Sequence, residues 1–281
     1  MKKQILYFSL FWLTAFSLIL GAVNLPVHSS ALSLMKMGST TAPSVAVNTN
    51  ASQFTLLNSE RLGITSMGLD LGDVDYCVFG WVYLDTAHDG TIICKDDNTN
   101  RSWFLRLGGV TAVRWGVNTG GTYQFLDSTF GTLSTGTWYF IYADHDSVNN
   151  LMRLSVNNNT IETLATDGAG TASTAEFALG GPSDGNLAIG LAFLDGRLQS
   201  VGTAPSILSD ANRTSLYNAG VPKGWCQLTA AQQALFNTAG GGWWDAGEAS
   251  GTRADSSTNA YNLTDFNTVT GNPGSRSGNC L

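Results

Sequence analysis

The chain has 281 residues and a formal net charge of −7, with 12% charged residues, 43% hydrophobic residues and 32 glycines. So low a charge content excludes a coiled coil, and the acidic balance lacks the basic stripe that is typical of nucleic-acid-binding proteins. The 13 Phe, 8 Trp and 8 Tyr exclude a disordered chain. The composition is typical of exported all-β proteins, and the length predicts one large β domain with additional segments.

The N-terminal segment has the features of a targeting sequence. Two lysines precede an apolar run over residues 5–23, and Ser29 and Ala31 place small residues before a cleavage site after Ala31. Residues 1–31 are therefore predicted to be a secretory signal peptide. The apolar run is also long enough to span a membrane as an uncleaved anchor, so both possibilities stay open. Contact with a membrane is expected only through this segment.

The next segment, residues 32–52, is polar and non-periodic, and is predicted to be a linker. From Phe54 onwards, short apolar or alternating runs recur between clusters of Gly, Asn and Asp, a pattern that predicts a β-sandwich or barrel. The predicted strands are Tyr76–Leu84, Gly90–Cys94, Ser102–Leu107, Val113–Val117, Trp138–Asp144, Leu151–Val156, Phe177–Leu179, Asn186–Phe193 and Gly196–Val201.

Two short helices are predicted towards the C-terminus. Ser209 is an N-cap for a helix over Asp210–Asn218. Thr229 and Gln232 form a capping box that opens a second helix, which ends near Phe236. Both helices are too short to be stable alone, so we expect them to pack on the sheet.

Four cysteines fit an oxidising compartment. Cys77, Cys94, Cys226 and Cys280 form no CxxC pair, which argues against a zinc site. Four cysteines allow three disulfide pairings. We favour Cys77–Cys94, because the two residues lie on successive predicted strands, and Cys226–Cys280, because that pair encloses the C-terminal tail. Free buried thiols are the alternative.

Phe54 and eight short stretches follow one another along the chain in an order and spacing that match a known family. The stretches are Asn58–Leu62, Gly72–Tyr76, Gly80–Asp85, Leu133–Phe140, His145–Ser147, Phe193–Leu198, Leu216–Gly220 and Trp243–Ser256. In these stretches the chain resembles the laminin-G-like, concanavalin A-like jelly rolls of secreted bacterial and phage proteins. The resemblance covers about residues 53–270 and implies an all-β fold, a jelly-roll sandwich of two antiparallel sheets packed face to face. On this basis the jelly roll is assigned to residues 53–225, and residues 226–281 to a short helix and a tail.

Two features depart from the family pattern. Gly196–Gln199 lacks the aspartate of the family's Gly-x-Ile-Asp, which weakens an inherited calcium site. The block from Trp243 resembles the family's opening strand, yet it lies at the C-terminus. The tail from Trp243 to Thr270 is therefore predicted to complete the sandwich of its own chain. Donation of the tail to a neighbouring molecule, or an unstructured remnant, are the alternatives.

Catalytic motifs are missing from the sequence. Polysaccharide-cleaving enzymes of this fold carry E-x-D-x-x-E on one strand, and no such string occurs among four glutamates (Glu60, Glu162, Glu176 and Glu248). His145 lies in Asp-His-Asp-Ser without a Gly-x-Ser-x-Gly elbow, and is assigned to a structural hairpin turn. The protein is therefore predicted not to be an enzyme.

Binding residues are easier to find, because sugars stack on aromatic rings and accept hydrogen bonds from Asn and Arg side chains. The early strands contain such a set, although Trp103 and Trp115 also fit a sandwich core. The Asp96-Asp97-Asn98 cluster is the densest group of oxygen ligands, so calcium is the one cofactor considered; a solvated loop is the alternative. The candidate glycan-binding residues are Trp103, Trp115, Tyr123, Arg101, Arg114 and Asn98, and the candidate calcium ligands are Asp96 and Asp97.

The sequence thus predicts a secreted, non-catalytic recognition or adhesion module whose partners are glycans or surface proteins. The alternative is a structural subunit of an extracellular filament, sheath or virion that assembles with copies of itself by strand exchange.

Overall fold

The computed structural model describes residues 50–65, 72–97, 99–182 and 193–274, all within the compact unit that begins at Ala42. The predicted signal peptide lies outside these residues, as do most of the predicted linker and most of the strand expected over Asn186–Phe193. In the described part of the chain, no helix is long and apolar enough to cross a membrane.

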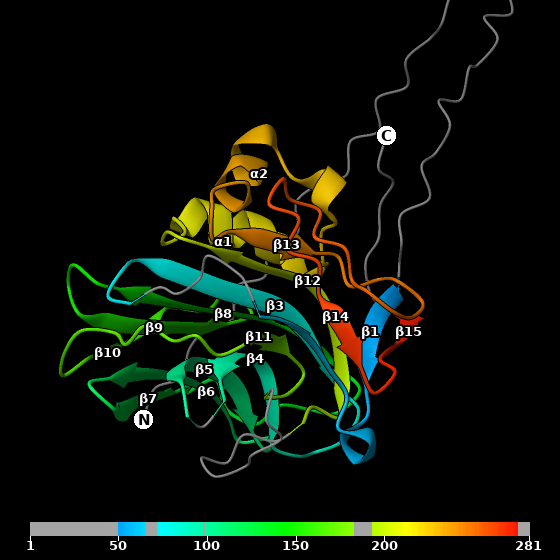
Figure 1. The fold of residues 1–281 in the computed structure, drawn as a ribbon, viewed down its shortest axis with the longest axis horizontal. Helices are drawn as coiled ribbons and strands as arrows, with labels where there is room; N and C mark the ends of the chain where they lie inside the picture. The colour runs from blue at the N-terminus through cyan, green and yellow to red at the C-terminus, as the bar shows by residue number, and fades with distance from the viewer. Residues whose placement is uncertain (1–49, 66–71, 98, 183–192, 275–281) are drawn as a thin grey trace, which may run out of the picture. The chain divides into compact units, whose positions relative to one another are not determined.

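Two antiparallel sheets form a sandwich, which confirms the predicted jelly-roll fold (Figure 1). The first sheet has eight strands in the order β10-β9-β8-β3-β12-β1-β15, with β13 paired to β12. Its strands are β1 (Asn50–Phe54), β3 (Tyr76–Leu84), β8 (Trp138–Asp146), β9 (Leu151–Val156), β10 (Glu162–Ala165), β12 (Gly196–Ala204), β13 (Gly242–Trp244) and β15 (Thr270–Pro273).

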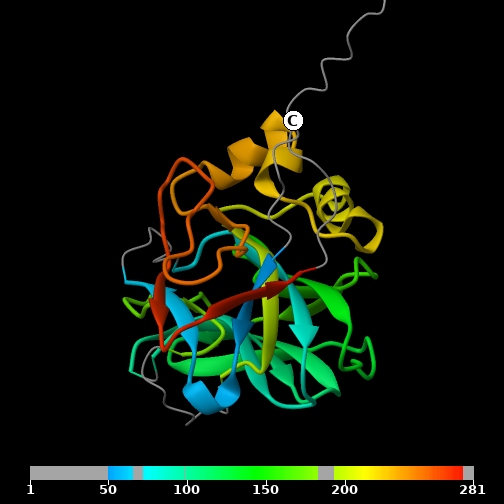
Figure 2. The same ribbon diagram turned by 90° about the vertical axis from the view of Figure 1, so that its right-hand side faces the viewer.

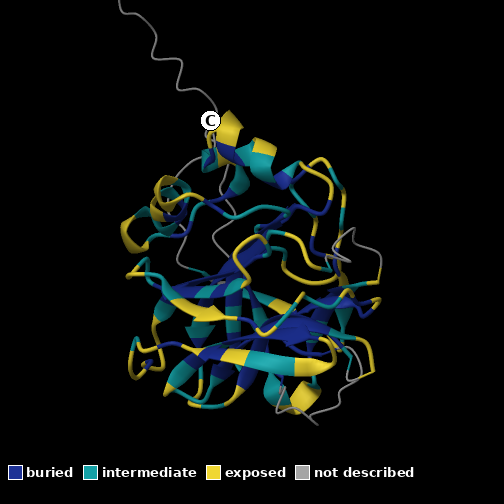
Figure 3. Ribbon diagram, turned by 90° about the vertical axis from the view of Figure 1, so that its left-hand side faces the viewer, coloured by how far each residue is buried: buried dark blue, intermediate teal, exposed yellow. Residues whose placement is uncertain are grey.

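The second sheet has seven strands in the order β14-β2-β11-β4-β5-β6-β7. Its strands are β2 (Arg61–Ile64), β4 (Gly90–Asp96), β5 (Arg101–Gly108), β6 (Ala112–Thr119), β7 (Thr122–Asp127), β11 (Phe177–Leu179) and β14 (Thr264–Phe266). Successive residues of a strand point to opposite faces, so each strand supplies one row to the core between the sheets and one row to an outer face. Figure 3 shows the buried residues concentrated between the sheets and beneath the helices.

The predicted helices are confirmed. Helix α1 (Asp210–Tyr217) begins at Ser209, whose hydroxyl accepts a hydrogen bond from the Asn212 N–H. Helix α2 (Ala230–Phe236) opens with the expected Thr229–Gln232 capping box. Both helices pack on the outer face of the eight-stranded sheet, where Leu216 and Phe236 join an aromatic cluster that includes Trp81 (Figure 1).

The C-terminal tail pairs with strands of its own chain at three places. β13 lies beside β12, β14 beside β2 and β15 beside β1, so the tail forms an edge of both sheets (Figure 2). β1 begins at Asn50, inside the segment expected to be a linker, because Asn50–Gln53 pair with β15 and Ser52–Phe54 pair with β12.

A fully buried arginine ties the tail to β1. Arg253 donates from Nε to the Ser52 hydroxyl at 2.7 Å and from Nη2 to the Val269 carbonyl at 2.9 Å. Ser52 in turn donates to the Ala246 carbonyl at 3.1 Å. A buried guanidinium is tolerated only when its donors are satisfied, so these contacts fix the path of the tail.

Candidate functional site

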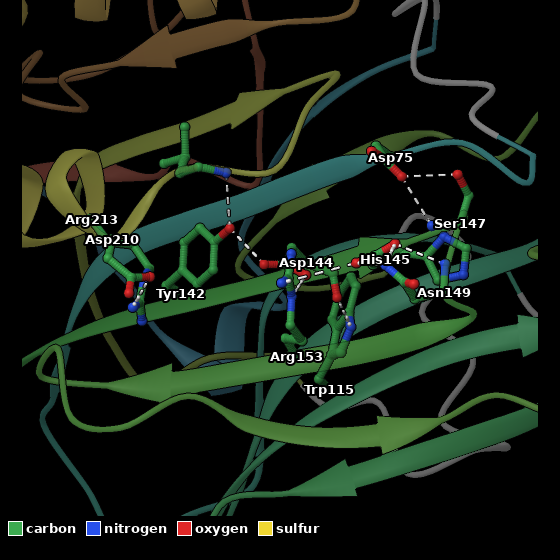
Figure 4. A network of polar contacts seen from close by, with 12 residues as sticks. Asp75, Trp115, Tyr142, Asp144, His145, Ser147, Asn149, Arg153, Asp210 and Arg213 are labelled. Carbon is green, nitrogen blue, oxygen red and sulfur yellow. Dashed lines mark hydrogen bonds and ion pairs between the residues drawn. The ribbon is translucent and has the colours of Figure 1, made fainter.

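The two tryptophans proposed as sugar-binding residues lie in the core, so that part of the sequence hypothesis is wrong. Trp103 on β5 and Trp115 on β6 both have 0% exposure, and their ring centres are 5.7 Å apart. The Trp115 indole N–H donates to the Asp144 carbonyl at 3.1 Å (Figure 4). The physical reason is the strand alternation, which turns both indoles towards the opposite sheet.

The same alternation places a different set of rings on the outer face of the seven-stranded sheet. Phe104 on β5 and Tyr123 and Phe125 on β7 form what we call the aromatic platform. The ring centres of Phe104 and Tyr123 are 5.1 Å apart, and those of Tyr123 and Phe125 are 5.8 Å apart with an interplanar angle of 14°. Phe104 is buried, Tyr123 is half-buried, and Phe125 is 44% exposed. Phe104 is tilted by 57° to Tyr123 and by 43° to Phe125, so the solvent-accessible part of the platform is the near-parallel pair Tyr123 and Phe125, with Phe104 buried beside them.

A glycine on the central strand allows the platform to form. Gly116 on β6 is the cross-strand partner of both Phe104 and Phe125. A Cβ atom at this position would lie 2.5 Å from the Phe104 ring. Because only glycine leaves that space, the Phe104 ring can lie across β6 towards the rings of β7.

Three arginine side chains surround the platform, each near one ring. The guanidinium carbon of Arg101 is 5.9 Å from the centre of Tyr123, that of Arg106 is 5.6 Å from Phe104, and that of Arg114 is 5.0 Å from Phe125. These are cation–π distances. Arg101, Arg114 and Tyr123 are therefore together on this face, as the sequence hypothesis required.

Acidic side chains near the platform offset the positive charge of these arginines. Arg114 makes a bidentate ion pair with Asp127 on β7, at 2.5 and 2.6 Å. The hydrogen bonds from Arg114 hold the pKa of Asp127 below its usual value. Burial, followed by the charge of Arg114 on the adjacent strand, lowers the pKa of Arg106, while Asp89 and Asp127 act in the opposite direction. The platform is thus bordered by planar, hydrogen-bonding groups of both signs.

A small pocket of about 350 Å³ lies beside the platform, at the ends of β5, β6 and β7. We call it the donor pocket, and it is lined by Thr99, Arg101, Asn118, Gly121 and Thr171. Asn118 is the cross-strand partner of Tyr123, which connects the pocket to the platform.

The predicted calcium ligands occupy the loop next to this pocket. Asp97 accepts hydrogen bonds on Oδ1 from the Thr99 and Asn100 N–H groups, at 3.0 and 2.5 Å, and on Oδ2 from the Asn100 side chain at 3.0 Å. Burial alone would raise the pKa of Asp97, but these hydrogen bonds outweigh it and lower the pKa. No group of three His, Cys, Asp or Glu side chains in the described residues is placed to hold a metal ion. Asn98 lies outside the described residues, so calcium binding at Asp96 and Asp97 stays a prediction.

Sequence reasoning missed Phe104, Phe125, Arg106 and Asn118. Each follows a predicted site residue by one to three positions, and Phe125 lies on β7, which was not predicted as a strand. The sequence hypothesis did not establish which side chains of β5 and β6 point into the core and which point to the outer face. The alternation of Arg114, Gly116 and Asn118 with Val113, Trp115 and Val117 was the available signal, since the second set is uniformly apolar.

The four glutamates have structural partners. Glu60 accepts from the Thr55 N–H at 2.6 Å, and both oxygens of Glu162 accept from the Thr129 N–H at 2.9 Å. Glu176 pairs with Arg61 at 3.3 Å, and Glu248 accepts from the Ala254 N–H at 2.9 Å. Glu162 also lines a larger cavity of about 610 Å³, near β9 and β10, together with Thr129, Phe130, Val156, Asn159 and Thr160.

The Asp-His-Asp-Ser segment belongs to a buried polar network rather than to an exposed site (Figure 4). Asp144 accepts from the Tyr142 hydroxyl at 2.6 Å and from Arg153 at 2.7 Å. Burial raises the pKa of Asp144, and the hydrogen bonds from Arg153 and Tyr142 only partly counteract this. β8 extends to Asp146, so the expected hairpin turn at His145 is wrong: the side chain has 0% exposure within a strand.

The predicted Cys77–Cys94 disulfide is wrong. Neither cysteine forms a disulfide, because the two buried residues lie on the outer faces of different sheets with the core between them. Burial raises the pKa of the Cys77 thiol well above its usual value. Cys280 lies outside the described residues, so the Cys226–Cys280 bridge stays a prediction.

Comparison with known proteins identifies the family. A family model described as the concanavalin A-like lectin/glucanases superfamily matches residues 57–212, which is more than half of the chain. The chain therefore belongs to this laminin-G-like family, as the sequence resemblance implied. No curated protein matches the chain.

Several solved structures are similar to this chain at low sequence identity. A Bacteroides ovatus protein assigned as carbohydrate-binding has a TM-score of 0.60 and 13% identity, over 83% of this chain and 61% of that one. A heptameric SAP-like pentraxin from Limulus polyphemus has a TM-score of 0.48 and 12% identity, over 63% of this chain and 85% of that one. Mouse laminin α1 domains LG4-5 have a TM-score of 0.46 and 16% identity, over 61% of this chain and 45% of that one. The chain thus spans less than two thirds of the Bacteroides protein.

Proposed function

We propose that the protein is a non-catalytic glycan-recognition module that binds sugars on the aromatic platform. The observation that carries the proposal is the set of three rings, Phe104, Tyr123 and Phe125, arranged on a sheet face and bordered by arginines. The C–H face of a sugar ring can stack on such a surface, and the guanidinium and carboxylate groups at its border can bind the hydroxyls.

The family context supports this proposal. The concanavalin A-like fold is shared with lectins, and the Bacteroides protein of the same fold is assigned as carbohydrate-binding. A fold alone does not define a function, so the platform geometry is the main support.

The absence of catalysis is part of the proposal. A retaining glycosidase needs two carboxyl groups about 5 Å apart, one of them free to transfer a proton. The carboxylates of Glu60, Glu162 and Glu248 accept hydrogen bonds from backbone N–H groups, and Glu176 is paired with Arg61. These contacts favour structural roles for all four side chains.

The proposed function also includes export of the protein from the cell. The composition and the predicted signal peptide over residues 1–31 support a secreted protein or one held at the cell surface. Mass spectrometry of the exported protein checks this: a mature N-terminus at Leu32 is expected, and an intact Met1 on membrane-associated protein would indicate an anchor.

Glycan binding can be tested with the full-length protein and a glycan array, with calcium and again with a chelator. We expect Phe125→Ala to lower the affinity for bound glycans about 10-fold or more, because a stacked ring is a typical hot spot. Leu164→Ala is the matched control, since Leu164 is 36% exposed on β10 of the other sheet. The proposal fails if no glycan binds, or if both variants bind like the wild type. If glycans bind in the presence of calcium but not in the presence of the chelator, calcium takes part in binding. Asp96 and Asp97 are then its candidate ligands.

A structural, self-assembling subunit is the second candidate. The observation that favours it is the position of β14 and β15 at the edges of the two sheets, paired with β2 and β1. The same pairings would be kept if the tail of one molecule were inserted into another. Size-exclusion chromatography with light scattering tests this candidate: a monomer at all concentrations argues against it, and a concentration-dependent polymer supports it.

A further inference from the structure

The donor pocket beside the platform has a chemistry that narrows the class of ligand, an inference that rests on the proposed function. The lining residues that the structure describes, Thr99, Arg101, Asn118, Gly121 and Thr171, include no carboxylate. The pocket adjoins Tyr123 through Asn118, its cross-strand partner, and through Arg101, whose guanidinium carbon lies 5.9 Å from the ring centre. A sugar stacked on Tyr123 would therefore direct a substituent towards these side chains.

The orientation of the Asn118 amide is fixed by a backbone contact. Its Oδ1 accepts a hydrogen bond from the Gly121 N–H at 3.0 Å, so the opposite end of the amide must be the NH₂ group. Asn118 is only 1% exposed, and its Nδ2 has no acceptor among the described residues. Buried donors are normally satisfied, so an exception at the wall of a pocket indicates a group that bonds to a ligand.

Two further side chains of the pocket can supply donors. The Thr171 hydroxyl accepts from the Gly120 N–H at 3.2 Å, which leaves its own hydrogen to donate. Arg101 has no acceptor atoms in its side chain. Asp96 is the cross-strand neighbour of Arg101, so an acidic residue lies on the strand next to this positive charge.

We infer that the donor pocket binds an oxygen acceptor on a sugar, namely the carbonyl of an acetamido group or the carboxylate of a uronic acid. Both groups present oxygens that only accept hydrogen bonds, whereas a hydroxyl also requires an acceptor for its own hydrogen. A volume of about 350 Å³ accommodates one such substituent with part of its ring.

Three β-1,4-linked tetrasaccharides, which differ only in the substituent, test this inference by calorimetry on the full-length protein. They are the tetramers of glucose, N-acetylglucosamine and glucuronic acid. We expect at least one substituted tetramer to bind about 10-fold more tightly than the glucose tetramer, and the better of the two identifies the acceptor. Equal affinity for all three, or array binding confined to sugars with neither substituent, overturns the inference and leaves the proposed function standing. Binding to no glycan at all is instead the failure of the proposed function.

Two variants test whether a preference for the substituted tetramers arises from the donor pocket. Asn118→Asp keeps the acceptor for the Gly121 N–H but replaces the NH₂ donor, so the affinity ratio between substituted and unsubstituted tetramers should fall to about 1. Thr171→Val removes the hydroxyl donor and should reduce the ratio several-fold; it serves if Asn118→Asp does not fold by circular dichroism. Asn159→Asp, the same change in an exposed residue near β9, is the control and should keep the ratio. An unchanged ratio in the folded pocket variants overturns the inference.

Discussion

The outer faces of the two sheets both carry a cluster of aromatic side chains, but helices cover only one of the two clusters. On the eight-stranded sheet, Phe79, Trp81 and Phe140 lie under the helices and β13, and all are nearly inaccessible. On the seven-stranded sheet, Phe104, Tyr123 and Phe125 are covered by no helix of the described residues, and the exposure rises from 0% at Phe104 to 44% at Phe125.

This difference shows that an aromatic cluster on a sheet does not by itself indicate a binding surface. The first cluster is a second core, because α2 and Trp243 complete it with ring centres 5.2 to 5.6 Å apart. The second cluster has arginines as its border in place of a helix. Large apolar groups left partly open to solvent are typical of interaction sites.

The largest expected effect is at the covered face. Trp243 is 1% exposed, contacts Phe79 and Phe236, and donates from its indole N–H to Asp245 at 2.8 Å. We expect Trp243→Ala to lower the free energy of unfolding by about 3–5 kcal/mol, because it leaves a cavity between the helices and the sheet. Urea denaturation followed by circular dichroism measures the change. A loss below about 1 kcal/mol would show that the helices do not depend on this ring.

A smaller loss of stability is expected beneath the platform. In Gly116→Ala, the new methyl group would overlap the Phe104 ring and displace it, at a cost of about 1–3 kcal/mol. Glycan affinity should fall together with stability, since a displaced Phe104 ring would no longer support Tyr123, whose ring centre lies 5.1 Å away. Gly108→Ala is the control on β5, because its Cβ would meet only ordinary contacts at 3.7 Å or more. Equal stability of both variants would contradict the role assigned to Gly116.

The exposed ring should matter for binding and hardly for folding. Phe125→Ala is expected to change the free energy of unfolding by less than about 1 kcal/mol, because the side chain is 44% exposed, while glycan affinity falls as proposed above. Chemical denaturation and the array experiment on one preparation give both values. A loss of stability as large as that of Trp243→Ala would mean that this face is also structural.

The smallest expected effects concern the pH dependence of stability, which should differ between the two faces. The folded pKa of Asp127 is lowered by Arg114, so its contribution is present above the unfolded pKa and is lost as pH falls through the folded pKa. The pKa of Asp144, beneath the helices, is raised by burial, so stability falls as pH rises from the unfolded to the folded pKa. Unfolding midpoints between pH 2.5 and 7 should therefore show a shallower rise with pH in Asp127→Asn. In Asp144→Asn the unfolding midpoint should rise more steeply with pH than in the wild type. If both variants show the wild-type pH dependence, the pKa directions given for Asp127 and Asp144 are wrong.

Local signals in the sequence were sufficient for most of the fold. β3, β9 and β11 have the predicted bounds, because their apolar runs are bounded by turn residues. Both helix starts were correct, because a capping residue bonds within three positions along the chain. β10, β14 and β15 were missed, because they are short or polar edge strands that depend on their partners.

The candidate site was predicted only in part. Residue types and approximate positions, such as Arg101, Arg114 and Tyr123, follow from the sequence. The direction of each side chain depends on the pairing of β5, β6 and β7, and a shift of one residue exchanges Trp103 for Phe104. The Cys77–Cys94 pairing failed for a related reason, because successive strands belong to different sheets.

The sequence by itself therefore determined the family, the strand pattern and the two helices, since alternation, caps and turns act over a few residues. The tertiary structure decided which aromatic rings are buried, which face the helices cover and how the tail joins both sheets. Those features depend on contacts between residues far apart in the chain, such as the bond of 2.7 Å between Arg253 and Ser52, and no local pattern specifies them.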